Sequence, residues 1–131
     1  MKIRNGALNR GGAMVEATVA GRRGVERVRR ARLSTGGERT LISSRLAARL
    51  QDVRGPRRCT DRTWAGRFCG PSAKIGVFVD NCRAATVRAV VAPLPHGFDL
   101  AVARDVLRRT VRIVDFGPVG PTVYCETMRR R

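Results

Sequence analysis

The stretch that indicates the fold is Leu33-Ser34-Thr35-Gly36-Gly37-Glu38-Arg39-Thr40-Leu41-Ile42-Ser43. An apolar residue is followed by small and glycine residues, and then by Thr-Leu-Ile-Ser. Upstream, alternating side chains over residues 14–20 predict a half-buried strand, and residues 25–33 predict the strand that returns from a turn at residues 21–24. The segment from Ser34 to Gly37 is therefore expected on a loop at the end of a strand.

A second informative stretch is Gly97-Phe98-Asp99-Leu100-Ala101-Val102-Ala103-Arg104-Asp105-Val106-Leu107, followed by an apolar segment over residues 111–116. Together the two stretches resemble the signatures of retropepsin-like (retroviral-type) aspartic proteases, in the same order along the chain. In that family the first signature is an apolar residue and Asp-Thr-Gly-Ala or Asp-Ser-Gly-Ala, and the second is an apolar pair, Gly, a variable residue, Asp and a short helix. The resemblance covers about residues 14–117 and implies an all-β, small closed barrel-like acid-protease (retropepsin) fold with one or two short helices.

The chain departs from the family at the position that carries catalysis. Ser34, followed by Thr35 and Gly36, stands where the family has its catalytic Asp. Aspartic proteolysis needs two carboxylates that share one proton, one from each subunit of the family's homodimer. A serine hydroxyl without an adjacent base cannot activate water, and the family topology brings neither a lysine nor the single histidine, His96, to this loop. No intact catalytic residue is therefore expected.

Other acidic residues near the signatures do not replace the missing Asp. Glu38 is expected to point away from the dyad, and Asp99 and Asp105 to brace the local backbone. Two further departures, Gly37 for Ala and Ala103 for Gly, favour natural decay of the site over a single engineered replacement of the Asp. The methyl group of Ala103 also implies some relaxation where the family's backbone segments cross.

Positive charge is the unusual bulk property of this chain. Lys and Arg number 27 against 10 acidic residues, which gives a net charge of +17, and only Lys2 and Lys74 are lysines. A GC-rich genome would explain the preference for arginine over lysine but not the surplus of charge. Arginine suits bidentate phosphate contact, and such a charge favours a polyanionic partner, for which RNA is the leading hypothesis. The candidate RNA-binding residues, several of which could instead form a solvated surface, are Arg22, Arg23, Arg29, Arg30, Arg57, Arg58, Arg129, Arg130 and Arg131.

The cysteines are few and irregularly spaced. Cys59, Cys69, Cys82 and Cys125 include no Cys-x-x-Cys pair, so we expect reduced, partly buried thiols and no metal or cofactor. No apolar run approaches the roughly 20 residues that span a bilayer, and the beginning of the chain lacks an apolar signal segment. An intracellular protein without a membrane partner is expected, with mitochondria as one location.

The remaining elements follow from local patterns. Residues 41–50 predict an amphipathic helix capped by Ser43 or Ser44, and residues 54–73, with Trp64 and Phe68, occupy the place of the family's flap. Trp64 and Phe68 are more readily explained by core packing than by stacking on a base. The other predicted elements are a hairpin of residues 75–79 and 84–92, a helix at 105–109, a strand at 111–116 and a loop at 117–121.

This pattern divides the chain into a basic flexible arm (1–12), a retropepsin-like domain (13–117) and a basic C-terminal tail (118–131). The leading functional hypothesis is an inactive retropepsin-like domain that binds RNA and neighbouring proteins in a ribonucleoprotein, such as an organellar ribosome. The alternatives are a retroelement- or virus-type aspartic endopeptidase in a form that lacks its Asp, and a protein–protein module that forms the family's homodimer.

Overall fold

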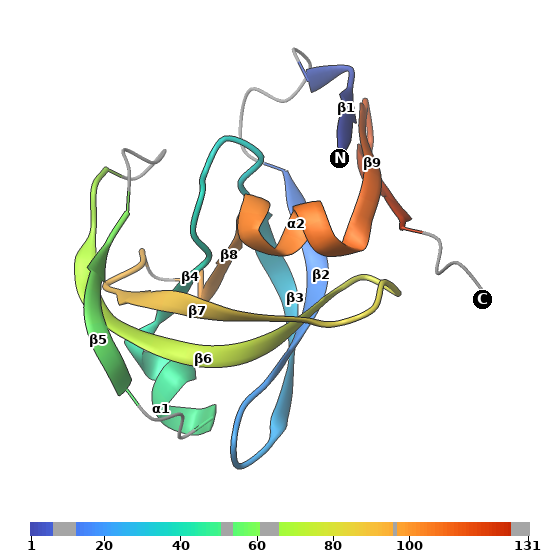
Figure 1. Ribbon diagram of the computed structural model, residues 1–131. Coiled ribbons are helices and arrows are strands. Elements are labelled where there is room, and N and C mark those ends of the chain that lie inside the picture. The colour runs from blue at the N-terminus through green and yellow to red at the C-terminus, as the bar shows by residue number, and fades with distance from the viewer. Residues whose placement is uncertain (7–12, 51–53, 61–65, 96, 127–131) are drawn as a thin grey trace.

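The structure is a computed structural model that describes residues 1–6, 13–50, 54–60, 66–95 and 97–126. The described part contains ten strands and two short helices, and most of the strands curve around one core (Figure 1). Trp64, His96 and Arg129 to Arg131 lie outside the described residues.

The first hairpin matches the alternation of its sequence. β2 (Met14–Ala20) pairs antiparallel with β3 (Val25–Leu33), and the turn is closed by a 2.9 Å hydrogen bond from Gly21 N to Gly24 O. Val15, Ala17 and Val19, the residues expected on one face, are all buried. Both predicted strands are therefore confirmed.

The segment predicted as one helix over residues 41–50 is divided in two. β4 (Leu41–Ser43) is a strand, and only α1 (Ser44–Leu50) is helical. β4 lies parallel to β7 (Ala85–Ala92) and antiparallel to β8 (Leu100–Val102), with all three of its residues buried. A strand that is buried on both faces lacks the alternation of apolar and polar residues that identifies a strand. The predicted helix therefore included residues 41–43, which form β4. The Oγ of Ser43 accepts a 3.1 Å hydrogen bond from Leu46 N, so this serine is the N-cap.

The middle of the chain forms a pair of hairpins. β5 (Arg54–Cys59) pairs antiparallel with β6 (Cys69–Val79), and β6 pairs antiparallel with β7. Asp80 turns the second hairpin with a φ of 51°, a left-handed conformation that Asp tolerates better than most residues. Phe68 packs against a small core cluster that includes Leu41 and Leu94, as the packing interpretation predicted for it.

The two ends of the described chain meet in a second sheet. α2 (Arg104–Thr110) leads into β9 (Val111–Gly117), which lies between β1 (Lys2–Arg4) and β10 (Gly120–Cys125). The expected flexible arm is therefore wrong for residues 2–4, and the expected loop and tail are wrong for residues 120–125. Pro121 and Gly120 lie in an edge strand, where a missing backbone donor is tolerated.

The barrel closes through six strands in the order β2-β3-β8-β4-β7-β6, because β2 also pairs with β6. β5 extends the sheet beyond β6. The core contains Val19, Val77 and Leu100 from the strands, together with Leu46 of α1 and Leu107 of α2. The expectation of an all-β, small closed barrel with two short helices is confirmed.

All four cysteines are paired, which contradicts the expectation of reduced thiols. Cys59 and Cys69 are direct partners across β5 and β6 and form one disulfide, and Cys82 and Cys125 form the other. Pairing in a β protein depends on strand register and on which segments meet in space, neither of which is visible in the spacing along the chain. The second disulfide joins the β6–β7 turn to the end of β10.

Candidate functional site

The loop that carries Ser34 is attached to the second signature by backbone hydrogen bonds. Ser34 N donates to Val102 O at 2.8 Å, and Arg104 N donates to Gly37 O at 2.9 Å. The loop thus begins at the end of β3 and lies beside the junction of β8 and α2. Its predicted position, on a loop at a strand end, is confirmed.

A buried side-chain contact joins the same two segments. The Oγ1 of Thr40, which is fully buried, donates to Asp105 Oδ1 at 2.7 Å, and Thr40 N donates to Asp105 Oδ2 at 3.0 Å. Ala103 N donates to Thr40 Oγ1 at 3.2 Å. Asp99 has a similar role, because it accepts a 2.7 Å hydrogen bond from Ser43 Oγ. The prediction that these acids brace the local backbone is confirmed for Asp105, whereas the carboxylate of Asp99 contacts the side chains of Ser43, Arg45 and Arg49.

Close packing surrounds the Ser34 hydroxyl. A Cβ placed on Gly37 would lie 2.7 Å from Ser34 Oγ and 3.6 Å from the Cβ of Ala103. The first distance is shorter than real Cβ contacts, whereas the second is an ordinary van der Waals contact. Ser34 Oγ therefore occupies space that Gly37 leaves open, and the buried methyl group of Ala103 is accommodated beside it.

The loop offers Ser34 no base. No described carboxylate or lysine forms a hydrogen bond with Ser34 Oγ. Glu38, the nearest acid along the chain, is paired with Arg104 at 3.1 Å and lies 3.9 Å from Arg108. Burial lowers the pKa of Arg32, two residues before Ser34, but an arginine remains protonated near neutral pH. Among the described residues, the arrangement can supply neither the aspartic dyad nor an activated serine nucleophile.

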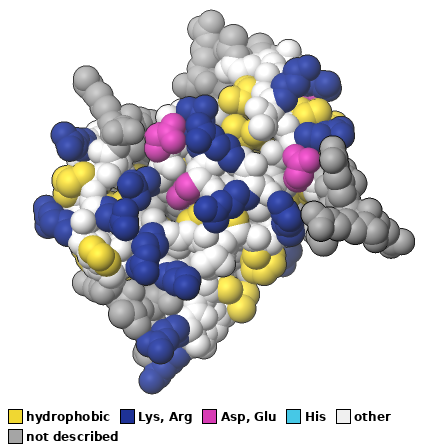
Figure 2. Space-filling model, in the orientation of Figure 1, with side chains coloured by type: hydrophobic (Ala, Val, Ile, Leu, Met, Phe, Trp, Pro, Cys, Tyr) yellow, Lys and Arg dark blue, Asp and Glu magenta, His cyan; other side chains and the backbone are white. Residues whose placement is uncertain are grey.

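A second feature is an open groove of about 510 Å³ across the outer face of β6 and β7. We call it the basic groove and define it by its five cationic side chains, which are Arg39, Arg58, Lys74, Arg88 and Arg109. Thr86, Val87, Glu38 and Asp105 complete its lining. Figure 2 shows lysine and arginine side chains crowded over this part of the barrel, with only a few acidic groups between them.

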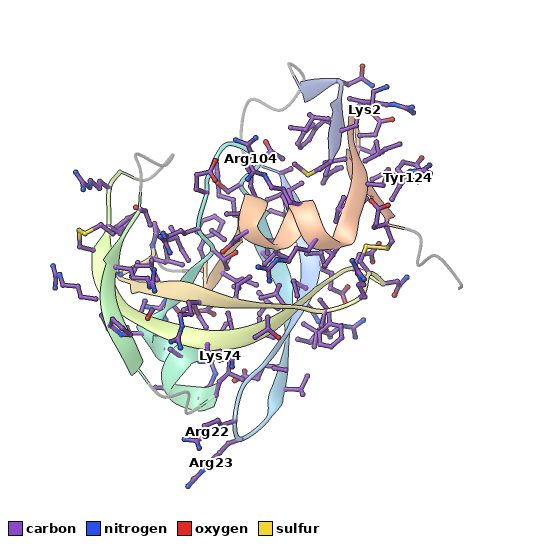
Figure 3. The ribbon with its side chains drawn as sticks, in the orientation of Figure 1. Lys2, Arg22, Arg23, Lys74, Arg104 and Tyr124 are labelled. Atoms are coloured by element: carbon purple, nitrogen blue, oxygen red, sulfur yellow. A yellow bond between two sulfur atoms is a disulfide. The ribbon has the colours of Figure 1, made fainter. Side chains whose placement is uncertain are left out.

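The predicted RNA-binding arginines are spread over several elements. Arg22 and Arg23 lie at the tip of the β2–β3 hairpin (Figure 3), Arg29 and Arg30 lie on β3, and Arg57 and Arg58 lie on β5. Only Arg58 lines the basic groove, while Arg22 lines a smaller adjoining hollow that shares Lys74 and Thr86 with it. The structure therefore brings two of the six described candidates together around Lys74.

The other groove cations, Arg39, Lys74, Arg88 and Arg109, were missed. Arg88 falls at an exposed position of the predicted hairpin and Lys74 falls directly before its first strand, so the alternation around Arg88 was a usable signal. Predicting that Lys74 and Arg88 lie opposite each other requires the strand register. Predicting that Arg39 and Arg109 lie close to them requires the tertiary fold.

Comparison of the chain with protein-family models, curated proteins and solved structures gives no match. Neither helix in the described part of the chain is long and apolar enough to cross a membrane. Within the same residues, no group of three or more His, Cys, Asp or Glu side chains is arranged to hold a metal ion.

Proposed function

We propose that this chain is a retropepsin-like domain without catalytic activity that binds RNA as a basic component of a ribonucleoprotein. The proposal is based on the basic groove, which gathers five cations from the loop before β4 and from β5, β6, β7 and α2. Phosphate contacts of this kind supply affinity without reading sequence.

The retropepsin part of the proposal is supported by the way the two signature segments contact each other. Ser34 N reaches Val102 O, Arg104 N reaches Gly37 O, and Thr40 bonds to Asp105. Contacts between the catalytic loop and the second signature are what the resemblance leads us to expect. Ser34 in place of Asp supports the absence of catalysis.

A more specific version of this proposal places the chain in an organellar ribosome, and the length and positive charge of the chain support it. It also requires both disulfides to persist inside the particle, whereas stable disulfides are most common in oxidising compartments. A thiol count on the protein isolated from its native source, with alkylation during lysis, therefore bears directly on the proposed location.

RNA binding is tested by fluorescence anisotropy with a labelled uridine-rich single strand of about 20 nucleotides. We expect saturable binding at 50 mM NaCl and a log–log dependence on salt with a slope of about −0.7 for each phosphate contacted. Engagement of four to six cations gives a slope between about −3 and −4. Absence of binding at 50 mM NaCl would overturn the proposal.

The endopeptidase alternative is supported by the geometry of the Ser34 loop. If Ser34→Asp produces a dimer that cleaves peptides while the unaltered chain fails to bind RNA, this alternative replaces the proposal. Sedimentation of the unaltered chain without RNA addresses the protein–protein alternative, which requires a stable dimer.

A further inference from the structure

The basic groove contains two like charges in direct opposition. Lys74 on β6 and Arg88 on β7 are register partners, and both side chains are exposed on the outer face of the barrel. Like charges directly opposite one another destabilise a strand pair. Neither side chain forms a hydrogen bond or ion pair with the described residues. The arrangement is unfavourable for the isolated protein and favourable for a bound anion.

Arg58 adds an unsatisfied donor to the same groove. Its Nε is buried and has no hydrogen-bond partner among the described residues. Leaving a buried donor unpaired costs about 1–3 kcal/mol, so such an atom normally has a partner. Because Nε is covered, an anion in the open groove would meet other atoms of this guanidinium, and Arg58 contributes its positive charge to the groove.

The carboxylates of the groove do not neutralise these cations. Both oxygens of Asp105 accept hydrogen bonds from Thr40, and Oδ1 also accepts one from Val106 N at 2.9 Å. Glu38 is paired with Arg104 on α2. The groove retains a surplus of positive charge, because its five cations face only two carboxylates and one of these, Glu38, is paired with a cation outside the groove.

Two contacts position the cations within the groove. Arg109 Nη1 donates to Thr86 O at 2.9 Å, which places this guanidinium against β7. A Cβ on Gly55 would lie 2.7 Å from Arg88 Nη1, so the absence of a side chain at Gly55 allows Arg88 to lie across β5. Two of the five groove cations, Arg88 and Arg109, are thus positioned against β5 and β7.

The shape of the surface indicates an extended ligand. The hollow lined by Ala20, Arg22 and Gly76 shares Lys74 and Thr86 with the groove, so the basic surface continues from Arg109 to the β2–β3 turn. No aromatic side chain is among the described residues that line either depression, so base stacking does not contribute there. A chain of phosphates that follows this path would contact several cations in turn.

We infer that the basic groove is the site where successive phosphates of an RNA backbone bind, with Lys74 and Arg88 on either side of one phosphate. This inference rests on the proposed RNA-binding function and assigns it a place on the molecule. Recognition is independent of base sequence because the contacts are made to the backbone.

The test compares two double variants with the same change in charge. Lys74→Gln/Arg88→Gln removes the opposed pair, and Arg29→Gln/Arg30→Gln removes two arginines of β3 outside the groove. With the uridine-rich strand at 100 mM NaCl, we expect the first variant to bind at least tenfold more weakly and its salt slope to fall in magnitude by about 1.4. The second variant should lose no more than about threefold.

A stability measurement separates binding from folding. Removing two opposed like charges should leave the Tm of the RNA-free protein unchanged or higher, so weaker binding by Lys74→Gln/Arg88→Gln would not reflect unfolding. Equal losses in the two variants would overturn the groove assignment while leaving RNA binding intact. If the unaltered protein does not bind the strand, the proposed function fails first, and the inference fails with it.

Discussion

Thr40 joins the two signature segments through both its backbone and its side chain. It is fully buried, its hydroxyl donates to Asp105, and the same hydroxyl accepts from Ala103 N. A hydroxyl that donates and accepts in a buried place cannot be replaced by a methyl group without leaving partners unsatisfied.

We therefore expect Thr40→Val to lower the free energy of unfolding by about 1–3 kcal/mol, although the side-chain volume is nearly conserved. Urea denaturation followed by circular dichroism measures the change. The control is Thr122→Val on β10, where the side chain is exposed and the change should stay within about 0.5 kcal/mol. Equal effects at the two positions would show that the Thr40–Asp105 contact does not stabilise the barrel.

At the scale of elements, the two disulfides constrain different parts of the chain. Cys82–Cys125 closes a separation of 43 residues and ties β10 to the barrel, whereas Cys59–Cys69 closes a separation of 10 residues within one hairpin. In the chain-entropy treatment the longer loop is worth about 4 kcal/mol and the shorter about 3 kcal/mol.

We expect Cys82→Ala/Cys125→Ala to destabilise the protein more than Cys59→Ala/Cys69→Ala, when both are measured by urea denaturation without reductant. In the presence of a reductant, the unaltered protein should lose at least as much stability as the more affected variant. A thiol titration of the unfolded, unreduced protein provides the independent check. Four titratable thiols would contradict both pairings.

The elements that could be predicted were those with a complete local pattern. β2 and β3 alternate, the turn between β6 and β7 contains Asp80 and Asn81, and α2 follows directly from the second signature. The local pattern predicts a helix where β4 lies, because Leu41 and Ile42 are both buried, and burial on both faces of a strand removes the alternation that identifies it. β1 and β10 depend on β9 as a partner, which no local pattern reports.

The same distinction applies to the candidate site. The Ser34 loop could be located because its residues are contiguous, and its lack of a base follows from the chemistry of serine. The basic groove could not be located, because it joins Arg39, Arg58 and Arg109 to the β6–β7 hairpin through tertiary structure. Composition leads only to the hypothesis of a polyanionic partner, whereas the opposition of Lys74 and Arg88 follows from the strand register.

For the whole molecule, the dominant quantity is the surplus of positive charge. With 27 basic and 10 acidic residues, most cations have no acid to pair with, and the described ion pairs involve only a few carboxylates, such as Glu26 and Glu38. Repulsion among the remaining cations acts over long distances and destabilises the compact state. Salt screens this repulsion, since the Debye length falls from about 30 Å at 0.01 M to about 8 Å at 0.15 M.

We expect the Tm to rise when NaCl is increased from about 10 to 150 mM, by roughly 3–5 °C for each kcal/mol of repulsion relieved. At equal ionic strength, sodium phosphate should raise the Tm further, because an anion that binds the folded groove stabilises it by mass action. Phosphate also stabilises proteins through exclusion from their surfaces, and that part should be equal in all variants. The difference between phosphate and chloride should therefore shrink in Lys74→Gln/Arg88→Gln and persist in Arg29→Gln/Arg30→Gln. A Tm that falls as NaCl is added would mean that attraction within the ion pairs outweighs the repulsion, despite a net charge of +17.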